Sequence, residues 1–309
     1  MKILITGSRG FIGGCLGRFA AHAGHEVLGV ARASQPSRDW PGEYVQADVV
    51  YADVAGVIRG FQPDLVFHGA GTASVGASMA APLDDLRAAV LTWANLLEGV
   101  RRSGCDPIVV FPSSAAVYGN PDRLPVREDC PAAPISPYGF HKAACELLAR
   151  EYATCFGLQL LVARIFSVYG PTQQRLLVWE LFEQCLNGDP VVSIQGTGDE
   201  SRDYLYSEDV ASAVLHAAER CRQDRQTRAY EVINVASGQE TRCAALAEQI
   251  RKLVAPNKSI RCHGHQRRGD PLQWRADISH LHELAPKWRP RPLGEGLAQC
   301  AAAWQSKPN

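Results

Sequence analysis

The first thirteen residues of the chain, MKILITGSRGFIG (residues 1–13), decide its fold. A short apolar run is followed by three glycines spaced three apart, and helical sequence continues over residues 14–23. Gly7, Gly10 and Gly13 permit a tight turn and let the backbone approach a pyrophosphate, whose charge is favoured by the free N–H groups at a helix N-terminus. Strand, glycine turn and helix in this order predict a dinucleotide-binding unit, although the spacing is Gly-x-x-Gly-x-x-Gly rather than Gly-x-Gly-x-x-Gly.

Further short apolar runs alternate with helical sequence in the first half of the chain. They lie at residues 26–30, 44–47, 65–67, 108–111 and 158–162. Such alternation predicts a parallel sheet covered by helices on both faces, which is the Rossmann-type, doubly wound α/β class.

The alternation of short apolar runs with helical sequence becomes less regular after Gly170-Pro171. A helix, a short strand, a second helix and a second strand are predicted at residues 174–186, 191–194, 207–219 and 230–235. The last two are typical of a return to the main sheet, and the remainder from residue 238 predicts small helices. We therefore expect a dinucleotide-binding domain over residues 1–170, with 203–237 returning to it. A smaller C-terminal substrate-binding lobe is expected over residues 171–202 and 238–309.

Composition and charge exclude several classes of protein. Of 309 residues, 46% are apolar, enough for a large core, and 32 basic residues balance 32 acidic ones. A net charge of zero gives no general attraction for nucleic acid or an anionic membrane. No stretch approaches the roughly 18 apolar residues that cross a bilayer. The N-terminal apolar run ends at Gly7, too short for a signal peptide, so we expect a cytoplasmic protein.

The cysteine and histidine patterns do not indicate a metal site. The ten cysteines are dispersed without a Cys-x-x-Cys pair, which favours free thiols in a reducing cytosol. His263 with His265, and His280 with His282, form two His-x-His pairs, but no Cys or carboxylate at ligand spacing completes either pair. We therefore expect no metal.

Tyr138 and Lys142 are the first candidates for catalysis. They stand four residues apart in a predicted helix that Ser136 can cap and Pro137 can begin, so both side chains share one helix face. A fixed cation close to a phenol favours the phenolate, which makes Tyr138 a candidate acid or base near neutral pH. Tyr-x-x-x-Lys is common on surface helices, but downstream of Ser114 and the glycine turn it indicates hydride chemistry on a bound dinucleotide.

An apolar stripe predicts a long helix over residues 82–103. Its members recur at steps of three and four: Leu83, Leu86, Val90, Trp93, Leu97 and Val100. Acidic residues in the first turn, Arg101 and Arg102 in the last turn and Gly104 after it agree with the helix dipole and a helix end. The stripe either packs on the sheet or pairs with a second subunit, and we predict exposed positions in it such as Trp93.

Motifs along nearly the whole chain resemble the extended short-chain dehydrogenase/reductases that modify nucleotide sugars. This group contains UDP-galactose 4-epimerase, nucleotide-sugar 4,6-dehydratases and 4-keto-6-deoxyhexose reductases. The matching segments are residues 6–13, 47–49, 68–71, 112–119, 136–142, 164–171, 196–210 and 267–270. Their number and order are specific for the family but much less specific for one reaction.

The resemblance implies roles for individual residues. It implies that Ser114 and Tyr138 hydrogen-bond the sugar oxygen at the reacting carbon, while Lys142 holds the nicotinamide ribose. Cofactor contacts are implied at Gly7, Arg9, Gly10, Phe11, Ile12, Gly13, Asp48, Val49, Ala70, Gly71 and Phe166. Nucleotide-sugar contacts are implied at Ser167, Arg202, Arg267 and Asp270, since the planar fork of Arg suits a diphosphate. Family members commonly form homodimers through two long helices, here residues 82–103 and 137–156.

Three departures from the family pattern bear on the reaction and on the cofactor. Ala115-Ala116 stands where dehydratases and decarboxylases carry a proton-transferring Glu, so those reactions are not expected. Ser167 replaces the usual Asn, so the donor that faces the diphosphate is a single hydroxyl on a shorter side chain. Arg32 follows the second strand where NAD-binding members usually have Asp, and with Arg9 it could flank a 2′-phosphate, so NADP(H) is favoured over NAD(H).

We therefore expect an NADP(H)-dependent oxidoreductase acting at C4 of a nucleotide-activated hexose. The main interpretation is a 4-keto-6-deoxyhexose reductase, because NADPH suits net reduction. The alternative is an NAD-dependent nucleotide-sugar 4-epimerase, which uses the same Ser114, Tyr138 and Lys142. A non-catalytic dinucleotide-sensing protein on this fold is a third possibility, against which the intact catalytic residues argue.

Overall fold

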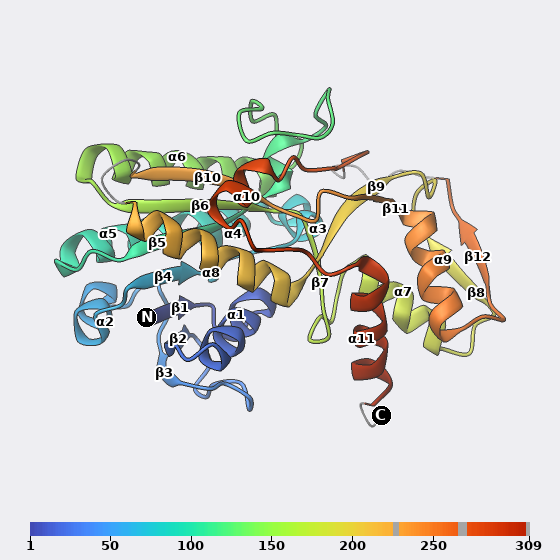
Figure 1. The fold of residues 1–309 in the computed structure, drawn as a ribbon, viewed down its shortest axis with the longest axis horizontal. Coiled ribbons are helices and arrows are strands. Elements are labelled where there is room, and N and C mark those ends of the chain that lie inside the picture. The colour runs from blue at the N-terminus through green and yellow to red at the C-terminus, as the bar shows by residue number, and fades with distance from the viewer. Residues whose placement is uncertain (225–228, 265–270, 307–309) are drawn as a thin grey trace.

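A seven-stranded sheet with the order β10-β6-β5-β4-β1-β2-β3 forms the centre of the molecule, and every neighbouring pair in it is parallel (Figure 1). The computed structural model describes residues 1–224, 229–264 and 271–306. The strands are β1 (Lys2–Thr6), β2 (Glu26–Ala31), β3 (Glu43–Gln46), β4 (Leu65–His68), β5 (Ile108–Ser114), β6 (Gln159–Ile165) and β10 (Tyr230–Val235). Each predicted apolar run forms one of these strands, and the predicted α/β class is confirmed.

Helices cover both faces of this sheet (Figure 1). α1 (Phe11–His22) and α8 (Ser207–Gln223) pack on one face; α2 (Val54–Phe61), α5 (Thr92–Ser103) and α6 (Pro137–Phe156) pack on the other. β1 shows the cause, because Ile3 and Ile5 enter the core under α1 while Leu4 enters the core under α2. The carboxyl ends of the strands meet at one edge, where Thr6 pairs with His68 and Ser114 with Ile165.

The chain leaves this sheet after β6 and returns to it with β10. Between and after them lie two small sheets. One contains β7 (Ser167–Tyr169), β9 (Ser201–Tyr206) and β11 (Glu240–Arg242); the other contains β8 (Val191–Ile194) and β12 (Ser259–Cys262). Three helices, α7 (Leu177–Leu186), α9 (Cys243–Val254) and α11 (Leu293–Gln305), share a core with them that includes Phe182, Leu246 and Trp304.

Two predictions for the second half of the chain need correction. α7 begins at Leu177, not near residue 174, because Leu176 has a left-handed φ of 72° that interrupts a helix. The segment after residue 238 is not only small helices, since α9 and α11 run for 12 and 13 residues and β11 and β12 are strands. β11 and β12 contain mostly polar and charged residues and no apolar run, so the sequence gives no strand signal there.

The helix predicted over residues 82–103 is continuous but not uniform. α4 (Pro82–Leu86) runs into a π-helical segment, Arg87–Leu91, before α5 begins. The wider turn rotates the later residues relative to the earlier ones, so Leu83 stays 57% exposed while Trp93 is fully buried. The prediction that Trp93 is exposed is therefore wrong: its ring lies between His68 and Phe111, and its Nε1–H donates to the Cys145 carbonyl at 2.9 Å.

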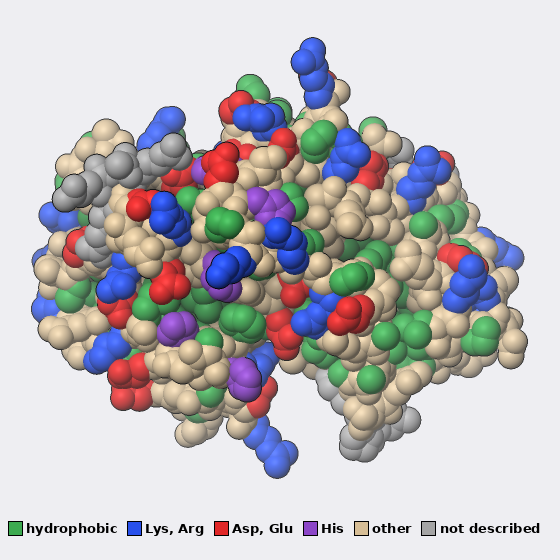
Figure 2. All heavy atoms as spheres, in the orientation of Figure 1, with side chains coloured by type: hydrophobic (Ala, Val, Ile, Leu, Met, Phe, Trp, Pro, Cys, Tyr) green, Lys and Arg blue, Asp and Glu red, His purple; other side chains and the backbone are tan. Residues whose placement is uncertain are grey.

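The surface carries mixed charge. Figure 2 shows basic and acidic side chains interspersed over the face it draws, in agreement with a net charge of zero. All ten cysteines fall within the described segments, and none forms a disulfide. No helix in residues 1–224, 229–264 or 271–306 has the length and apolar character needed to span a membrane.

Candidate active site

The glycine turn lies at the carboxyl end of β1 and opens α1. Gly7 has a left-handed φ of 66°, and a Cβ on it would lie 2.3 Å from the carbonyl carbon of Gly69 in the loop after β4. Gly10 precedes α1 and no side chain caps this helix, so the backbone N–H groups at Phe11, Ile12 and Gly13 can serve another acceptor. The turn therefore fits the pyrophosphate of a dinucleotide.

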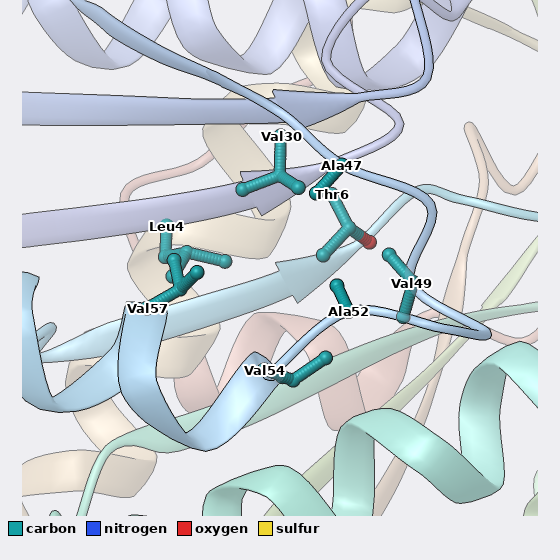
Figure 3. A pocket seen from close by; sticks show the side chains of 8 residues that line it. All are labelled: Leu4, Thr6, Val30, Ala47, Val49, Ala52, Val54 and Val57. Atoms are coloured by element: carbon teal, nitrogen blue, oxygen red, sulfur yellow. The ribbon is translucent and has the colours of Figure 1, made fainter.

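An apolar hollow lies near this turn, at the carboxyl ends of β1 and β2 (Figure 3). It is lined by Leu4, Thr6, Val30, Ala47, Val49, Ala52, Val54 and Val57. Asp48, beside it, turns its Oδ1 to its own loop and accepts from the Val50 N–H at 3.0 Å. An apolar wall in this place is chemically suited to the adenine ring of a dinucleotide, and Val49, one of the residues predicted to contact the cofactor, forms part of it.

Arg9 and Arg32 are exposed near the same end of the sheet. The Arg32 carbonyl accepts from Gln46 Nε2 at 3.3 Å. Neither guanidinium is hydrogen-bonded or ion-paired to another residue in the described part of the chain. Both charges therefore remain available to an anionic group.

Two residues predicted for the cofactor, Ala70 and Gly71, follow β4, which ends at His68. Burial lowers the pKa of His68 to about 3, with the charge of Lys142 adding to the effect, so this ring is neutral. Its Nδ1 lies 3.0 Å from Thr6 Oγ1, which also accepts from the Ala70 N–H at 3.3 Å. Gly71 follows in an exposed loop with a φ of 132°. A neutral histidine thus fixes the start of this loop.

Ser114 and the Tyr138–Lys142 pair come from two elements that pack together. Ser114 ends β5 and caps a short 3₁₀ helix, η2 (Ala115–Tyr118), with its Oγ 3.2 Å from the Ala116 N–H. Ser136 caps α6 as predicted, and Pro137 is its first residue. A Cβ on Gly139 would lie 2.6 Å from the Ala116 carbonyl oxygen. Glycine at this position therefore allows the first turn of α6 to press against η2.

Lys142 is directed to the same place as Tyr138. Its ammonium donates to the Pro112 carbonyl at 2.8 Å and lies 5.8 Å from the centre of the Tyr138 ring. The prediction that the two side chains share one helix face and one site agrees with this geometry. Ala115 and Ala116 are buried next to Ser114 and offer no group that can carry a proton.

A buried polar network supports the end of β5 from below. Glu146 of α6 accepts from Ser113 Oγ at 2.5 Å and from Arg164 Nη2 at 2.8 Å. The same guanidinium donates to the Tyr118 hydroxyl at 2.9 Å, which donates to Asn234 Oδ1 at 2.7 Å. Burial raises the pKa of Tyr118, so its hydroxyl stays neutral and can donate. This network ties β5, β6, β10 and α6 together directly behind Ser114.

Two further side chains hold the first turns of α6 from the other side. Ser78 of α3 (Val75–Ala80) is fully buried and accepts from the Tyr138 N–H at 3.0 Å. Asp85 of α4 is buried, and its Oδ2 lies 2.5 Å from Nδ1 of His141, the residue before Lys142. The other oxygen of Asp85 has no hydrogen-bond partner in the described segments.

Ser167 and Arg202, two of the residues predicted for the nucleotide sugar, lie on the lobe side of the site. Ser167 opens β7, and Phe166 before it, a residue predicted for the cofactor, is buried after β6. The Arg202 guanidinium of β9 lies 5.3 Å above the Trp274 ring, and Trp274 meets Phe166 edge-on at 6.0 Å. Phe166 and Arg202 are thus brought together through Trp274. Arg267 and Asp270 lie outside the described residues, as does His265.

Asp203, next to Arg202, connects the lobe to the sheet. Its carboxylate accepts from the N–H groups of Ser237, Gly238 and Ala276 and from Ser237 Oγ, over 2.6–3.2 Å. Burial nevertheless raises the pKa of Asp203 to about 6, because the four hydrogen bonds offset only part of the loss of solvation. β9 and the segments around residues 237 and 276 therefore meet at one buried carboxyl group.

A dinucleotide-binding turn and a Ser–Tyr–Lys set at the carboxyl edge of a parallel sheet define a class of oxidoreductase-type enzymes. Residues 3–236 match the NAD dependent epimerase/dehydratase family, and the chain belongs to this family. It is an enzyme of the NAD-dependent nucleotide-sugar epimerase/dehydratase type, with a NAD(P) dinucleotide as its cofactor.

Known relatives resemble the chain over nearly its full length. It is 30% identical over 319 residues to UDP-glucose 4-epimerase of Mycolicibacterium smegmatis, covering 99% of each protein. GDP-6-deoxy-D-mannose reductase of Pseudomonas aeruginosa is 28% identical over 319 residues, with 99% of this chain and 98% of the relative covered. The crystal structure of Thermus thermophilus UDP-glucose 4-epimerase in complex with NAD superposes with a TM-score of 0.86 at 27% identity, covering 99% of each chain.

Sequence reasoning missed the supporting residues of the site. Trp274, Asp203, Glu146, Asp85 and Ser78 touch predicted site residues or their neighbours but were not singled out. Most of them come from distant parts of the chain and become neighbours only in the folded sheet and lobe. The signal available in the sequence was the position of Asp203, directly after Arg202 in the matching segment 196–210.

Proposed function

We propose that the protein is a nucleotide-sugar 4-epimerase that acts through Ser114, Tyr138 and Lys142. The observation that carries the proposal is the packing of the first turn of α6, with Tyr138 and Lys142 close together, against η2, which begins directly after Ser114 and opens with two buried alanines. The 30% identity to a UDP-glucose 4-epimerase over the whole chain supports the same reaction, which was the alternative in the sequence interpretation.

The chemistry at C4 is a proton transfer coupled to a hydride transfer. A bound nicotinamide ring would supply the hydride acceptor and donor. Tyr138, at the start of α6, serves as the acid–base group: as the phenolate it takes the proton from the C4 hydroxyl, and as the phenol it returns the proton. Ser114 donates a hydrogen bond to the same oxygen, on which negative charge develops. Lys142 places a positive charge beside the Tyr138 ring and is itself held by the Pro112 carbonyl.

Elimination is not expected from this site. Removing water across C5 and C6 of a sugar requires a second proton carrier near the catalytic serine. Ala115 is fully buried and Ala116 nearly so, and neither side chain can transfer a proton. The proposal therefore concerns chemistry at C4 alone.

A reductase that uses NADPH is the second candidate. Arg32, exposed and without an ion-pair partner among the described residues, stands where an Asp would repel a 2′-phosphate. The similarity to the GDP-6-deoxy-D-mannose reductase of Pseudomonas aeruginosa also supports a reductase. The protein of Thermus thermophilus was solved with NAD, which supports the epimerase instead.

One experiment separates the two candidates. The purified protein is incubated with UDP-glucose, UDP-galactose, other nucleotide hexoses and 4-keto-6-deoxy nucleotide sugars, and the reduced nicotinamide absorbance is followed. Interconversion of two nucleotide sugars without a net absorbance change supports the epimerase. Stoichiometric loss of NADPH with a 4-keto substrate identifies the reductase and overturns the first proposal.

Arg32→Ala tests the cofactor preference. If Arg32 contacts a 2′-phosphate, NADPH binding weakens by roughly 1.5–3 kcal/mol, the scale of a hydrogen bond with a charged group, while NADH changes little. Equal losses for both cofactors mean that Arg32 stacks on the adenine. Wild-type protein that prefers NADH supports the epimerase.

The lobe completes the proposal. We assign residues 171–202 and 238–309 to binding of the nucleotide part of the sugar substrate, with Arg202 near the diphosphate. The dinucleotide domain is proposed to comprise residues 1–170 and 203–237, with β7 and β9 at its boundaries pairing in the small sheet that also contains β11. The assembly is proposed to be a homodimer through α4, the π segment and α6.

A further inference from the structure

Trp274 occupies the junction between the catalytic segment and the lobe. Its Nε1–H donates to the Gly119 carbonyl at 3.1 Å, directly after η2, and its ring meets Phe166 edge-on with centroids 6.0 Å apart. Only 8% of this side chain is exposed. Trp274 therefore has a fixed ring plane, determined by contacts with the same segments that carry Ser114 and the end of β6.

The backbone around Trp274 is fixed from both sides. Its N–H donates to the Ser201 carbonyl at 3.2 Å, and the Ser201 N–H donates to the Leu272 carbonyl at 3.0 Å. On the opposite side, the Val126 N–H donates to the Arg275 carbonyl at 2.8 Å. Residues 271–277, which we call the strap, thus run between β9 and the loop that follows η2.

Arg202 lies over the ring of Trp274. Its guanidinium carbon is 5.3 Å from the Trp274 ring centre, within the range of a cation–π contact. Nη1 donates to the Ser201 carbonyl at 2.7 Å and weakly to the Leu272 carbonyl at 3.4 Å. Nε and Nη2 donate to no other residue in the described part of the chain. Nη1 of the guanidinium is held by the protein, and Nε and Nη2 can donate to a ligand.

We propose that Trp274 is a positioning residue that orients Arg202 toward the diphosphate of a nucleotide-sugar substrate. The inference rests on the proposed function, in which Arg202 contacts that diphosphate. A guanidinium binds a diphosphate best when its plane is fixed before the ligand arrives, because less side-chain entropy is lost on binding. The ring face of Trp274 fixes that plane, and the strap fixes Trp274 relative to Ser114. Arg202, which binds the diphosphate, and Ser114, which contacts the oxygen at the reacting sugar carbon, are thereby held at a fixed distance from each other.

Calorimetry with UDP and with GDP tests the proposal on the full-length chain. Trp274→Leu keeps bulk but removes the aromatic face, and we expect about 5- to 30-fold weaker binding of the better nucleotide. Trp274→Phe keeps an aromatic face and should remain within about 3-fold of the wild type. Trp288→Phe is the matched control, since Trp288 is 5% exposed and its Nε1–H donates to the Asp209 carbonyl at 3.0 Å.

The double variant identifies the route of the effect. Arg202→Ala alone should weaken binding by at least about 10-fold, since charge-assisted hydrogen bonds are lost. If Trp274 acts through Arg202, Trp274→Leu combined with Arg202→Ala should bind within about 2-fold of Arg202→Ala alone. In turnover assays, KM should rise in Trp274→Leu by much more than kcat falls. Circular dichroism checks that each variant is folded, and Trp274→Met, which also lacks an aromatic face, replaces Trp274→Leu if the latter does not fold.

Different failures overturn different statements. Unchanged nucleotide binding in Trp274→Leu, or losses that multiply in the double variant, overturn the positioning role while the proposed function stands. Recovery of binding in Trp274→Phe supports the aromatic face as the cause, and a loss equal to that of Trp274→Leu contradicts it. Wild-type protein that binds neither UDP nor GDP overturns the proposed function and this inference together.

Discussion

At the scale of single residues, Tyr138 carries the strongest prediction. Tyr138→Phe removes the acid–base hydroxyl but keeps the ring, so turnover should fall by at least about 100-fold with little loss of stability. Tyr152→Phe is the matched control, because Tyr152 lies on the same helix with its hydroxyl 3.4 Å from Glu98 and outside the site. Rates are measured at saturating substrate and cofactor. Turnover near that of the wild type in a folded Tyr138→Phe protein contradicts the assignment.

Asp203 gives a prediction about pH. Burial raises its pKa in the folded protein to about 6, above the ordinary value of 3.8. Because the folded protein holds the Asp203 proton more tightly than the unfolded chain, protonated Asp203 contributes to the free energy of unfolding. This contribution is fully present below about pH 4 and is lost as the pH rises through about 6. For this largely buried group the loss is on the order of 1–3 kcal/mol. Urea unfolding at pH 4, 5, 6 and 7 measures it.

Asp203→Asn provides the comparison for that series. The amide does not titrate, so the stability of the wild type relative to the variant should decline between pH 4 and pH 7. The variant should also be less stable at every pH. Its NH₂ group would face the Gly238 and Ala276 N–H groups, which donate hydrogen bonds to the carboxylate in the wild type. Parallel pH curves for the two proteins contradict the raised pKa.

Single residues also show what the sequence can predict. Tyr138, Lys142 and Ser114 were found because a short spacing on one helix and a preceding serine are visible in the chain. Trp274 and Glu146 were not found, because each becomes important only through partners roughly 20 to 150 residues away that include Arg164 and Gly119. No local pattern encodes such contacts, since they depend on the finished topology.

At the scale of elements, the start of α6 is held by α3 and α4. His141→Ala would leave the buried Asp85 carboxylate without its partner, so the free energy of unfolding should fall by about 2–5 kcal/mol. His141→Gln can still donate a hydrogen bond and should lose less. Thermal unfolding compares the two variants. Equal small losses would mean that the Asp85–His141 contact contributes little to holding α6.

Element boundaries were predictable where a residue type alone determines them. Ser136, Pro137 and Gly157 set the ends of α6 at Pro137 and Phe156, as predicted for residues 137–156. The π segment between α4 and α5 was not predictable, because the apolar stripe has the same spacing on both sides of it. The spacing alone therefore predicts an exposed Trp93, although this residue packs on the sheet.

At the scale of the whole molecule, the dimer is the main prediction. α4, the π segment and α6 lie side by side and carry six exposed large apolar residues: Leu83, Leu86, Leu91, Phe140, Leu147 and Phe156. Exposed apolar surface of this kind usually marks an interface, and a two-fold dimer is the simplest closed assembly. Light scattering at micromolar concentration should give about twice the chain mass of 33.6 kDa.

Charged substitutions test which surface forms that dimer. Leu83→Asp and Phe140→Asp should shift the mass toward one chain, because a carboxylate would be buried in an apolar interface. Leu253→Asp is the matched control, since Leu253 is 45% exposed on α9 in the lobe. A wild-type mass of one chain across the micromolar range overturns the dimer. A dimer unaffected by Leu83→Asp and Phe140→Asp places the interface elsewhere.

The late return of β10 to the sheet has a consequence for synthesis on the ribosome. β6 pairs with β10 along six residues, from Leu160 with Tyr230 to Ile165 with Val235, and the lobe helix α7 and strands β8 and β9 are translated between them. Until β10 emerges, β6 is an open edge with unpaired backbone groups, the kind of surface that recruits strands from other chains. A nascent chain halted near residue 170 should therefore depend on chaperones. A recombinant fragment cut there should aggregate, whereas chains that extend beyond β10 should not.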